Sequence, residues 1–299
     1  MAARPSLVKA SSAHSYGHGE VVRAAGRLIE WAQSAPPTRP EDEYIHELRV
    51  RLRRCRAAMR AFRRFYRSRG AYERRVERLR RLSRALGPLR DSDVTAGLLE
   101  DALKTAPHAP RAVVSMLERH RHARERRWTR VLPALAAIAG LAPEALAPPR
   151  PPPGEKAPRG KRRLDRHARA TLARRFNEVW RLRRVLESRD PLELHALRIE
   201  IKRLRYSVEA FDAITGAAGR RWGAALKKLQ STLGVINDHT VALSVVERFL
   251  QSEARPMEAA ALQRLAATLE AHRDFVVARF LVEWRQADPT RMRALIQTL

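Results

Sequence analysis

Residues 46–56 read HELRVRLRRCR, and residues 195–205 read HALRIEIKRLR. The two stretches align without a gap as far as Phe62 and Phe211, with identical residues at 7 of 17 positions. Chance similarity between two arginine-rich helices could account for one such match. A second match, in the same order in each half of the chain, would make chance similarity a poor explanation.

A second pair of similar stretches follows in the same order in each half of the chain. The matched positions are LRRL at 79–82 with LKKL at 226–229, Gly87 with Gly234, and Asp91 with Asp238. Two matches in one order predict an internal duplication, which gives two related helical bundles with approximate two-fold symmetry.

Both opening stretches have the periodicity of an amphipathic helix. At about 100° per residue, the histidine and three cations of each copy lie within one arc, beside a stripe of apolar residues. The cationic stripes are His46, Arg49, Arg53 and Arg56, and His195, Arg198, Lys202 and Arg205. The apolar stripes are Leu48, Leu52, Cys55, Met59 and Phe62, and Leu197, Ile201, Leu204, Val208 and Phe211. We expect the apolar faces to form the core and the two cationic faces to lie opposite each other.

The rest of the sequence also favours helix, because Ala, Leu, Arg and Glu dominate it and no alternating β-branched run of strand length occurs. The expected fold class is all-α. Helices are expected near 19–34, 41–68, 71–86, 91–105 and 110–139, and near 161–188, 191–214, 218–233, 238–254 and 257–285. Gly87 and Gly234 are expected to end a helix, and Asp91 and Asp238 to cap the next one.

A proline-rich segment at 142–160 separates the two halves, and it holds seven prolines. Such a composition predicts a solvated, semi-rigid spacer outside the core. The expected division is a first bundle at 1–141, this linker, and a second bundle at 161–299.

The composition predicts a polyanionic partner. The chain has 60 Lys and Arg against 32 Asp and Glu, a net charge of +28, and the excess is present in both halves. Ten arginines and no acidic residue lie between Arg49 and Arg69. Like charges three or four residues apart destabilise an isolated helix, so a bound polyanion would relieve this repulsion. Nucleic acid, anionic lipid and polyphosphate all have suitable chemistry.

Several other classes of protein are excluded at this stage. Cys55 is the only cysteine, so no disulfide framework or cysteine-based zinc site is expected, and its place on the apolar stripe predicts an inert buried thiol. No apolar run is long enough for a secretory signal or a membrane span. We therefore expect a cytoplasmic protein with no membrane association.

The sequence also lacks the signals of an enzyme. There is no nucleophile elbow, no glycine-rich phosphate loop and no recurring set of metal ligands, so no catalytic residue, metal or cofactor is expected. The carboxylates of Asp91 and Asp93 could suggest a magnesium site, but Thr240 stands where the second copy would need the second carboxylate. Structural capping is the preferred interpretation.

The pattern H-x-x-R-x-x-x-[KR]-R-x-R, followed by L-G-x-x-x-D, occurs in both halves and resembles the conserved-histidine α-helical domain (CHAD) family from about residue 18 to about residue 283. The resemblance implies duplicated helical bundles whose basic faces line a central groove or cavity, and it implies binding of inorganic polyphosphate. The anion-binding positions that it implies are His46, Arg49, Arg53, Arg54 and Arg56, and His195, Arg198, Lys202, Arg203 and Arg205. Arg80, Arg81, Lys227 and Lys228 on the following helices are second-rank candidates.

The leading functional hypothesis is non-catalytic binding of polyphosphate, with the protein associated with polyphosphate granules. Guanidinium groups bind phosphate oxygens in pairs, and a ligand without bases needs no aromatic stacking platform. A non-specific nucleic-acid-binding protein is the first alternative, since phosphate contact needs only Lys and Arg. An accessory subunit of a polyphosphate-metabolising enzyme is another. Polyphosphate is therefore the expected partner, and nucleic acid a weaker one.

Overall fold

The structure of the chain is a computed structural model, and it describes residues 12–36, 40–104, 111–151, 163–188, 190–252, 256–287 and 289–299. Within these ranges the chain forms helices and no β-strand, which confirms the all-α prediction. The helices of the first half are α2 (Ala13–Gln33), α3 (Asp42–Ala61), η1 (Arg63–Phe65), α4 (Arg69–Lys104), α5 (Arg111–Ala139) and η2 (Pro143–Ala145). Those of the second half are α6 (Leu164–Arg181), η4 (Leu182–Arg184), α7 (Val185–Ser188), α8 (Pro191–Ala210), α9 (Asp212–Ser252), α10 (Pro256–Gln286) and α11 (Pro289–Thr298).

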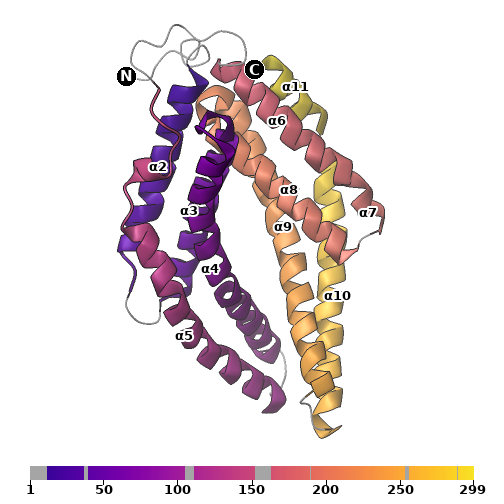
Figure 1. Cartoon of the computed structure of the whole chain (residues 1–299). Helices are drawn as coiled ribbons and strands as arrows, with labels where there is room; N and C mark the ends of the chain where they lie inside the picture. Colours follow the sequence, from indigo (N-terminus) through magenta and orange to yellow (C-terminus); the bar gives the residue numbers. More distant parts are fainter. Residues whose placement is uncertain are drawn as a thin grey trace.

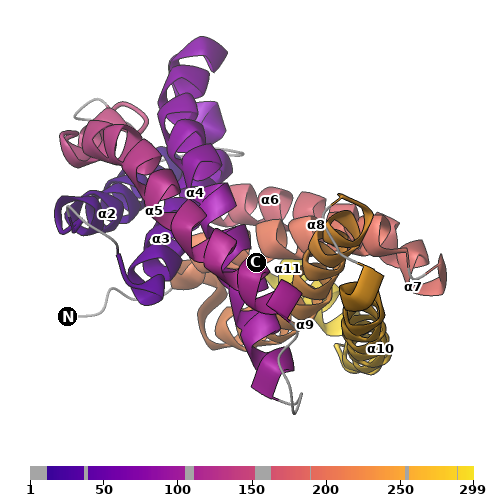
Figure 2. The same ribbon diagram turned by 90° about the horizontal axis from the view of Figure 1, so that it is seen from below.

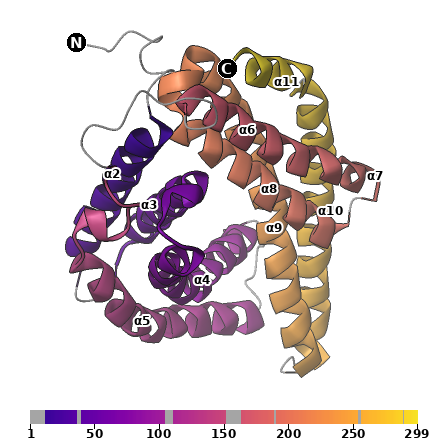
Figure 3. The same cartoon turned by 45° about the horizontal axis from the view of Figure 1, so that its top comes forward.

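The helices form two groups that lie side by side. Helices α2 to α5 make up one group, and α6 to α11 make up the other (Figures 1 and 2). In the first group α5 curves past α3 and α4, whereas in the second α9 and α10 run along each other as a long pair (Figure 3). No helix in the described parts of the chain is long and apolar enough to cross a lipid bilayer.

The two groups meet where α3 packs against α8, as the sequence predicts, and also where α4 packs against α9. Phe62 and Phe211, which end the two aligned stretches, contact each other edge to face with ring centroids 5.3 Å apart, and both are fully buried. The ring of His167 on α6 packs against both phenylalanines, and its Nε2 donates a hydrogen bond to the Ala61 carbonyl, 2.9 Å away. The aligned helices thus share one core, while their origin by duplication remains a prediction from the alignment.

Two predicted helix breaks are wrong. Helix α4 continues through Gly87 and Pro88, and α9 continues through Gly234, so Asp91 and Asp238 do not begin new helices. One helical glycine costs only about 1 kcal/mol relative to alanine, and buried leucines such as Leu86 and Leu89 hold α4 against its neighbours. Among the described glycines, Gly216 is the one with a positive φ (56°), and it produces a kink near the start of α9 instead.

The prediction of a solvated spacer is wrong for the first part of the proline-rich segment. Leu146 and Ala147 are buried, and the hydroxyl of Tyr66 donates to the Leu146 carbonyl at 2.7 Å. The imidazoles of His14 and His18 on α2 lie 2.8 Å from the carbonyls of Pro149 and Pro148. These contacts attach the segment to the first group, whereas residues 152–160 lie outside the described part. The division into 1–141, 142–160 and 161–299 stays a prediction.

Gly17 on α2 is required by close packing against Phe62. A Cβ at this position would lie 2.5 Å from Cδ1 of the fully buried Phe62 ring. We expect Gly17→Ala to lower the free energy of unfolding by about 1–3 kcal/mol, because the ring has no room to move. At Gly19, two residues along the same helix, the nearest atom to an added Cβ is a guanidinium nitrogen 3.6 Å away. Gly19→Ala is therefore the control and should be neutral or stabilising. Urea denaturation of both variants tests the contact, and equal effects would contradict it.

Candidate anion-binding site

The contact between α3 and α8 brings cations from both aligned stretches together. Lys202 on α8 lies at their centre, and its pKa is lowered to about 7, first by burial and then by Arg198, Arg53, Arg203 and Arg56. No carboxylate is among the groups that shift this pKa, and the ammonium has no hydrogen-bond or ion-pair partner within the described residues. Arg53, Arg56, Arg198, Lys202 and Arg203 are called the central cluster below.

Arg53 and Arg56 hold fixed positions on the α3 side of the cluster. The Nε of Arg53 donates to the hydroxyl of Tyr206 on α8 at 3.1 Å, and Nη1 of Arg56 donates to Oγ of Ser83 on α4 at 3.1 Å. The pKa of Arg56 is lowered by burial and next by Arg80. These guanidinium groups are thus held close to other cations at a free-energy cost that a bound anion would reduce.

The sequence analysis missed two members of this region. Arg60 lies one turn beyond Arg56, and its pKa is lowered by burial and then by Arg203 on α8. In the alignment of the two stretches Arg60 is matched by Glu209, so the copies do not share a cation at this position. Tyr206 is matched by Ala57 in the first copy, so the copies do not share this residue either. Both lie at the contact of α3 with α8, which a comparison of the two copies cannot show.

Two other predicted residues, Arg205 and Arg54, share one carboxylate as their ion-pair partner. Glu209 accepts from Nη1 of Arg205 at 2.7 Å and lies 3.5 Å from Nε of Arg54. Arg205 is also only 8% exposed, donates to the side chain of Gln230 at 3.0 Å and stacks over the ring of Tyr206. Arg205 therefore belongs mainly to the packing of α8 on α9, whereas Arg54 is exposed and weakly paired.

Arg49 and Arg198, in contrast, reach the long helix that follows each of them. Nη1 of Arg49 donates to the Leu86 carbonyl of α4 at 2.8 Å. A Cβ at Gly234 of α9 would lie 3.9 Å from Nε and Nη2 of Arg198. Arg203 is paired with Glu200, one turn before it on α8.

The two histidines that begin the aligned stretches are both exposed, but their surroundings differ. Nδ1 of His195 donates to Oδ1 of Asn237 on α9 at 2.5 Å. His46 lines a pocket of about 580 Å³ between α3, α8 and α9, together with Arg53, Arg54 and Lys227. This pocket, called the main pocket below, also has three carboxylates in its lining: Glu47, Glu209 and Asp212.

The second-rank cations do not gather at one place. Arg80 is paired with Glu73 at 2.8 Å and with Glu77 at 3.7 Å, and Arg81 is exposed. Lys227 lines the main pocket, but Lys228 contacts Glu283 of α10 at 3.7 Å. Adjacent residues of a helix point about 100° apart, so α9 directs only the first of these two lysines toward the pocket.

The carboxylate of Asp93 has a structural role. Its Oδ1 accepts from Nε of Arg124 at 2.7 Å, and this nearly buried arginine of α5 also contacts Asp42 at the start of α3. The pair therefore links α3, α4 and α5. Among the described residues, no group of three or more His, Cys, Asp or Glu side chains is placed to hold a metal ion. Burial raises the pKa of the Cys55 thiol to about 12, which removes its nucleophilic form at neutral pH.

The family model described as "CHAD domain" matches residues 23–247, which are three quarters of the chain. The chain belongs to the CHAD domain family. The matched range contains both aligned stretches, and therefore the whole central cluster and the main pocket.

Two solved structures have the same fold as this CHAD chain. The crystal structure of the CHAD domain from the plant Ricinus communis has 22% sequence identity and a TM-score of 0.58, and the match covers 98% of this chain and 93% of that one. PptA from Streptomyces chartreusis has 19% identity and a TM-score of 0.70, with 92% of this chain and all of that one covered. None of the curated proteins compared with the chain matches it.

Proposed function

We propose that this CHAD protein binds inorganic polyphosphate at the central cluster and does not change it chemically. The observation that carries the proposal is the position of Lys202, a partly buried ammonium whose pKa is lowered by burial and by four guanidinium groups and is raised by no carboxylate. A folded protein tolerates such an arrangement when a ligand supplies the missing negative charge. Polyphosphate supplies one charge in each unit, and arginine binds phosphate oxygens with two parallel hydrogen bonds.

The surroundings of Tyr206 favour polyphosphate over a single-stranded nucleic acid. Proteins that bind single-stranded nucleic acids use exposed aromatic rings on which the bases stack. Tyr206 is buried, Arg205 covers its ring with the guanidinium carbon 4.2 Å from the ring centroid, and Arg53 occupies its hydroxyl. The site thus offers cations without a free stacking surface. In competition, long polyphosphate should displace DNA far more readily than DNA displaces polyphosphate.

The carboxylates around the site favour binding without catalysis. Glu209, Glu200 and Glu77 are each held in an ion pair with an arginine, so they are not arranged to activate water or hold magnesium. We infer that the protein is located in the cytoplasm at polyphosphate granules. Co-localisation of the tagged protein with granules, compared in cells unable to make polyphosphate, tests this. If the protein were instead an accessory subunit of an enzyme, the tagged protein would co-localise with that enzyme in both kinds of cell.

Affinity is expected to rise steeply with the length of the polyphosphate chain. A flexible anion engages more cations as it lengthens, until the basic surface is filled. Chains of several tens of units should bind at least about a hundredfold more tightly than tripolyphosphate, and ATP should compete poorly. Isothermal titration with size-fractionated polyphosphate measures this. Equal affinity for tripolyphosphate and long chains would indicate a closed site for a small anion and would favour an enzyme.

A further inference from the structure

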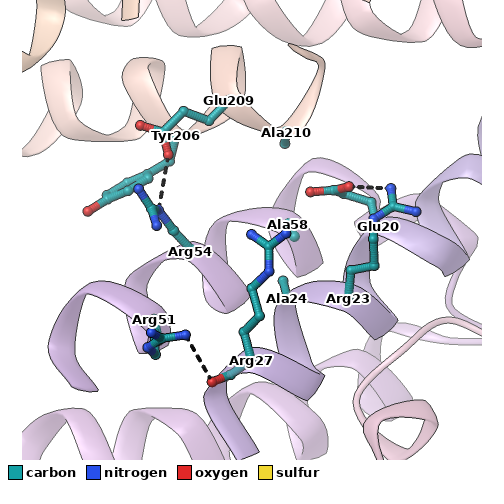
Figure 4. A pocket seen from close by; sticks show the side chains of 10 residues that line it. All are labelled: Glu20, Arg23, Ala24, Arg27, Arg51, Arg54, Ala58, Tyr206, Glu209 and Ala210. Atoms are coloured by element: carbon teal, nitrogen blue, oxygen red, sulfur yellow. Dashed lines mark hydrogen bonds and ion pairs between the residues drawn. The ribbon is translucent and has the colours of Figure 1, made fainter. Parts of the chain in front are cut away.

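A second pocket, of about 300 Å³, lies between α2, α3 and α8 (Figure 4). It will be called the α2 pocket. Four arginines line it, Arg23 and Arg27 from α2 and Arg51 and Arg54 from α3, against two carboxylates, Glu20 and Glu209. Its lining thus has an excess of two positive charges. The α2 arginines lie outside the two aligned stretches and were not candidates from the sequence.

The α2 pocket adjoins the main pocket. Arg54, Tyr206 and Glu209 line both of them, so these three side chains form the boundary between the pockets. The ion pair of Arg54 with Glu209, at 3.5 Å, lies at this boundary. Tyr206 also accepts from Arg53 of the central cluster. A ligand in the main pocket that extends past this ion pair therefore enters the α2 pocket.

The arginines of the α2 pocket differ in how strongly they are already held. Arg23 pairs with Glu20 at 2.6 Å, and Arg51 stacks over Trp31 with its guanidinium carbon 4.5 Å from the ring centroid. The side chain of Arg27 is exposed, has no partner within the described ranges, and extends into the space between Arg54 and Arg23 (Figure 4). Its guanidinium group is therefore available to an anion without breaking any contact.

We propose that the α2 pocket is a second phosphate-binding site, which takes the next units of a polyphosphate chain already bound at the central cluster. This proposal rests on the proposed function. Phosphate oxygens replace Glu209 as the partner of Arg54 and then reach Arg27 and Arg23. Glu209 keeps its closer contact with Arg205, at 2.7 Å, so its displacement from Arg54 leaves no unpaired carboxylate.

Binding by the double variant Arg23→Gln and Arg27→Gln tests the proposal. Titrations at fixed salt use tripolyphosphate and polyphosphate of several tens of units. We expect the long chain to bind at least about tenfold more weakly, or about 1.4 kcal/mol, and tripolyphosphate to bind as it does to the natural protein. Arg126→Gln with Arg130→Gln is the matched control, since both arginines are exposed on α5 and have no partner within the described residues.

The short ligand separates failure of this proposal from failure of the proposed function. Equal loss for both ligands, or no loss for the long chain, would each overturn the second site and leave the central cluster as the site. Equal loss in the control would also overturn the second site, because it would show that net charge governs binding. Absence of polyphosphate binding by the natural protein would overturn both proposals. The variant Glu209→Gln removes the competing carboxylate and should strengthen long-chain binding severalfold. If long chains bound this variant no more tightly than the natural protein, the proposal that phosphate displaces Glu209 from Arg54 would be wrong.

Discussion

Replacing Arg53, Arg56 and Lys202 together with glutamine is expected to weaken polyphosphate binding at least about a hundredfold at low salt. Each of these side chains supplies a cation at the contact between α3 and α8, and two of them are partly desolvated. Removal of a charge-assisted hydrogen bond to phosphate costs about tenfold in affinity, or 1.4 kcal/mol. The dependence of affinity on salt should also become shallower, by roughly 0.7 in logarithmic slope for each phosphate that the variant no longer binds. Titrations over a series of salt concentrations measure both effects.

The matched control removes the same charge elsewhere. Arg126 and Arg130 on α5 and Arg264 on α10 are exposed and have no partner in the described parts of the chain. Their joint replacement with glutamine should leave most of the affinity. Equal losses in the two triple variants would show that net charge governs binding and that the central cluster is not the site.

The cluster variant is not expected to be less stable than the natural protein. Burial disfavours the charged forms of Arg56 and Lys202, and the cations repel each other in the unliganded fold. Removing them offsets the loss of two hydrogen bonds, from Arg53 to Tyr206 and from Arg56 to Ser83, each worth about 1 kcal/mol. Thermal unfolding should therefore show an unchanged or higher midpoint, so weaker binding cannot be attributed to unfolding.

Polyphosphate affinity is expected to fall as pH rises above 7. Burial and the surrounding Arg198, Arg53, Arg203 and Arg56 lower the pKa of Lys202 to about 7, so the unliganded site loses a charge near neutrality. A bound polyanion favours the protonated amine and raises this pKa, so binding above pH 7 takes up a proton. Affinity then falls by up to tenfold in each pH unit between the two pKa values. Binding at about pH 8.5 should be roughly twentyfold weaker than at about pH 6.5.

The variant Lys202→Arg isolates this effect, because a guanidinium group stays charged throughout the range. The variant should bind polyphosphate at about pH 8.5 nearly as tightly as at about pH 6.5. Titration of the ligand or of histidines would affect both proteins equally, so the difference between their pH profiles reports on Lys202. Identical pH profiles for the variant and the natural protein would rule out Lys202 as the titrating group. The contribution of Lys202 to stability should change in the opposite direction to affinity. Lys202 binds fewer protons in the unliganded fold than in the unfolded chain between pH 7 and 10.5, so its contribution to the free energy of unfolding rises with pH there.

The outcome at Gly87 and Gly234 shows where local signals stop being informative. Both glycines were expected to end helices, but α4 and α9 continue through them. A glycine weakens a helix by an amount that a few buried leucines readily offset. Leu86 and Leu89 on either side of Gly87 are fully buried. The bounds of these helices therefore depend on packing against other helices, which the few residues around each glycine do not reveal.

For the charged residues too, the sequence predicts some properties and the packing of the helices decides others. The positions of the cationic stripes follow from helical periodicity, and the structure places Arg53, Arg56, Arg198 and Lys202 near one another. Periodicity does not fix the rotation of a helix against its neighbours, which directs Lys227 to the main pocket and Lys228 to Glu283. Nor does it reveal that Glu209 pairs with Arg54 of the other half, or that Arg23 and Arg27 share a pocket with Arg54.

The sequence by itself determined the all-α fold class, the apolar and cationic faces of α3 and α8, and the family resemblance, because each depends on residue type and spacing along one helix. Only the tertiary structure decided which cations stay unpaired, which are neutralised and which lose solvent. Those properties depend on side chains brought together from α2, α3, α8 and α9, such as Arg53 with Tyr206 and Lys202 with Arg56. Burial and the electric field of neighbouring charges arise only when the helices pack, and these set the charge state of Lys202.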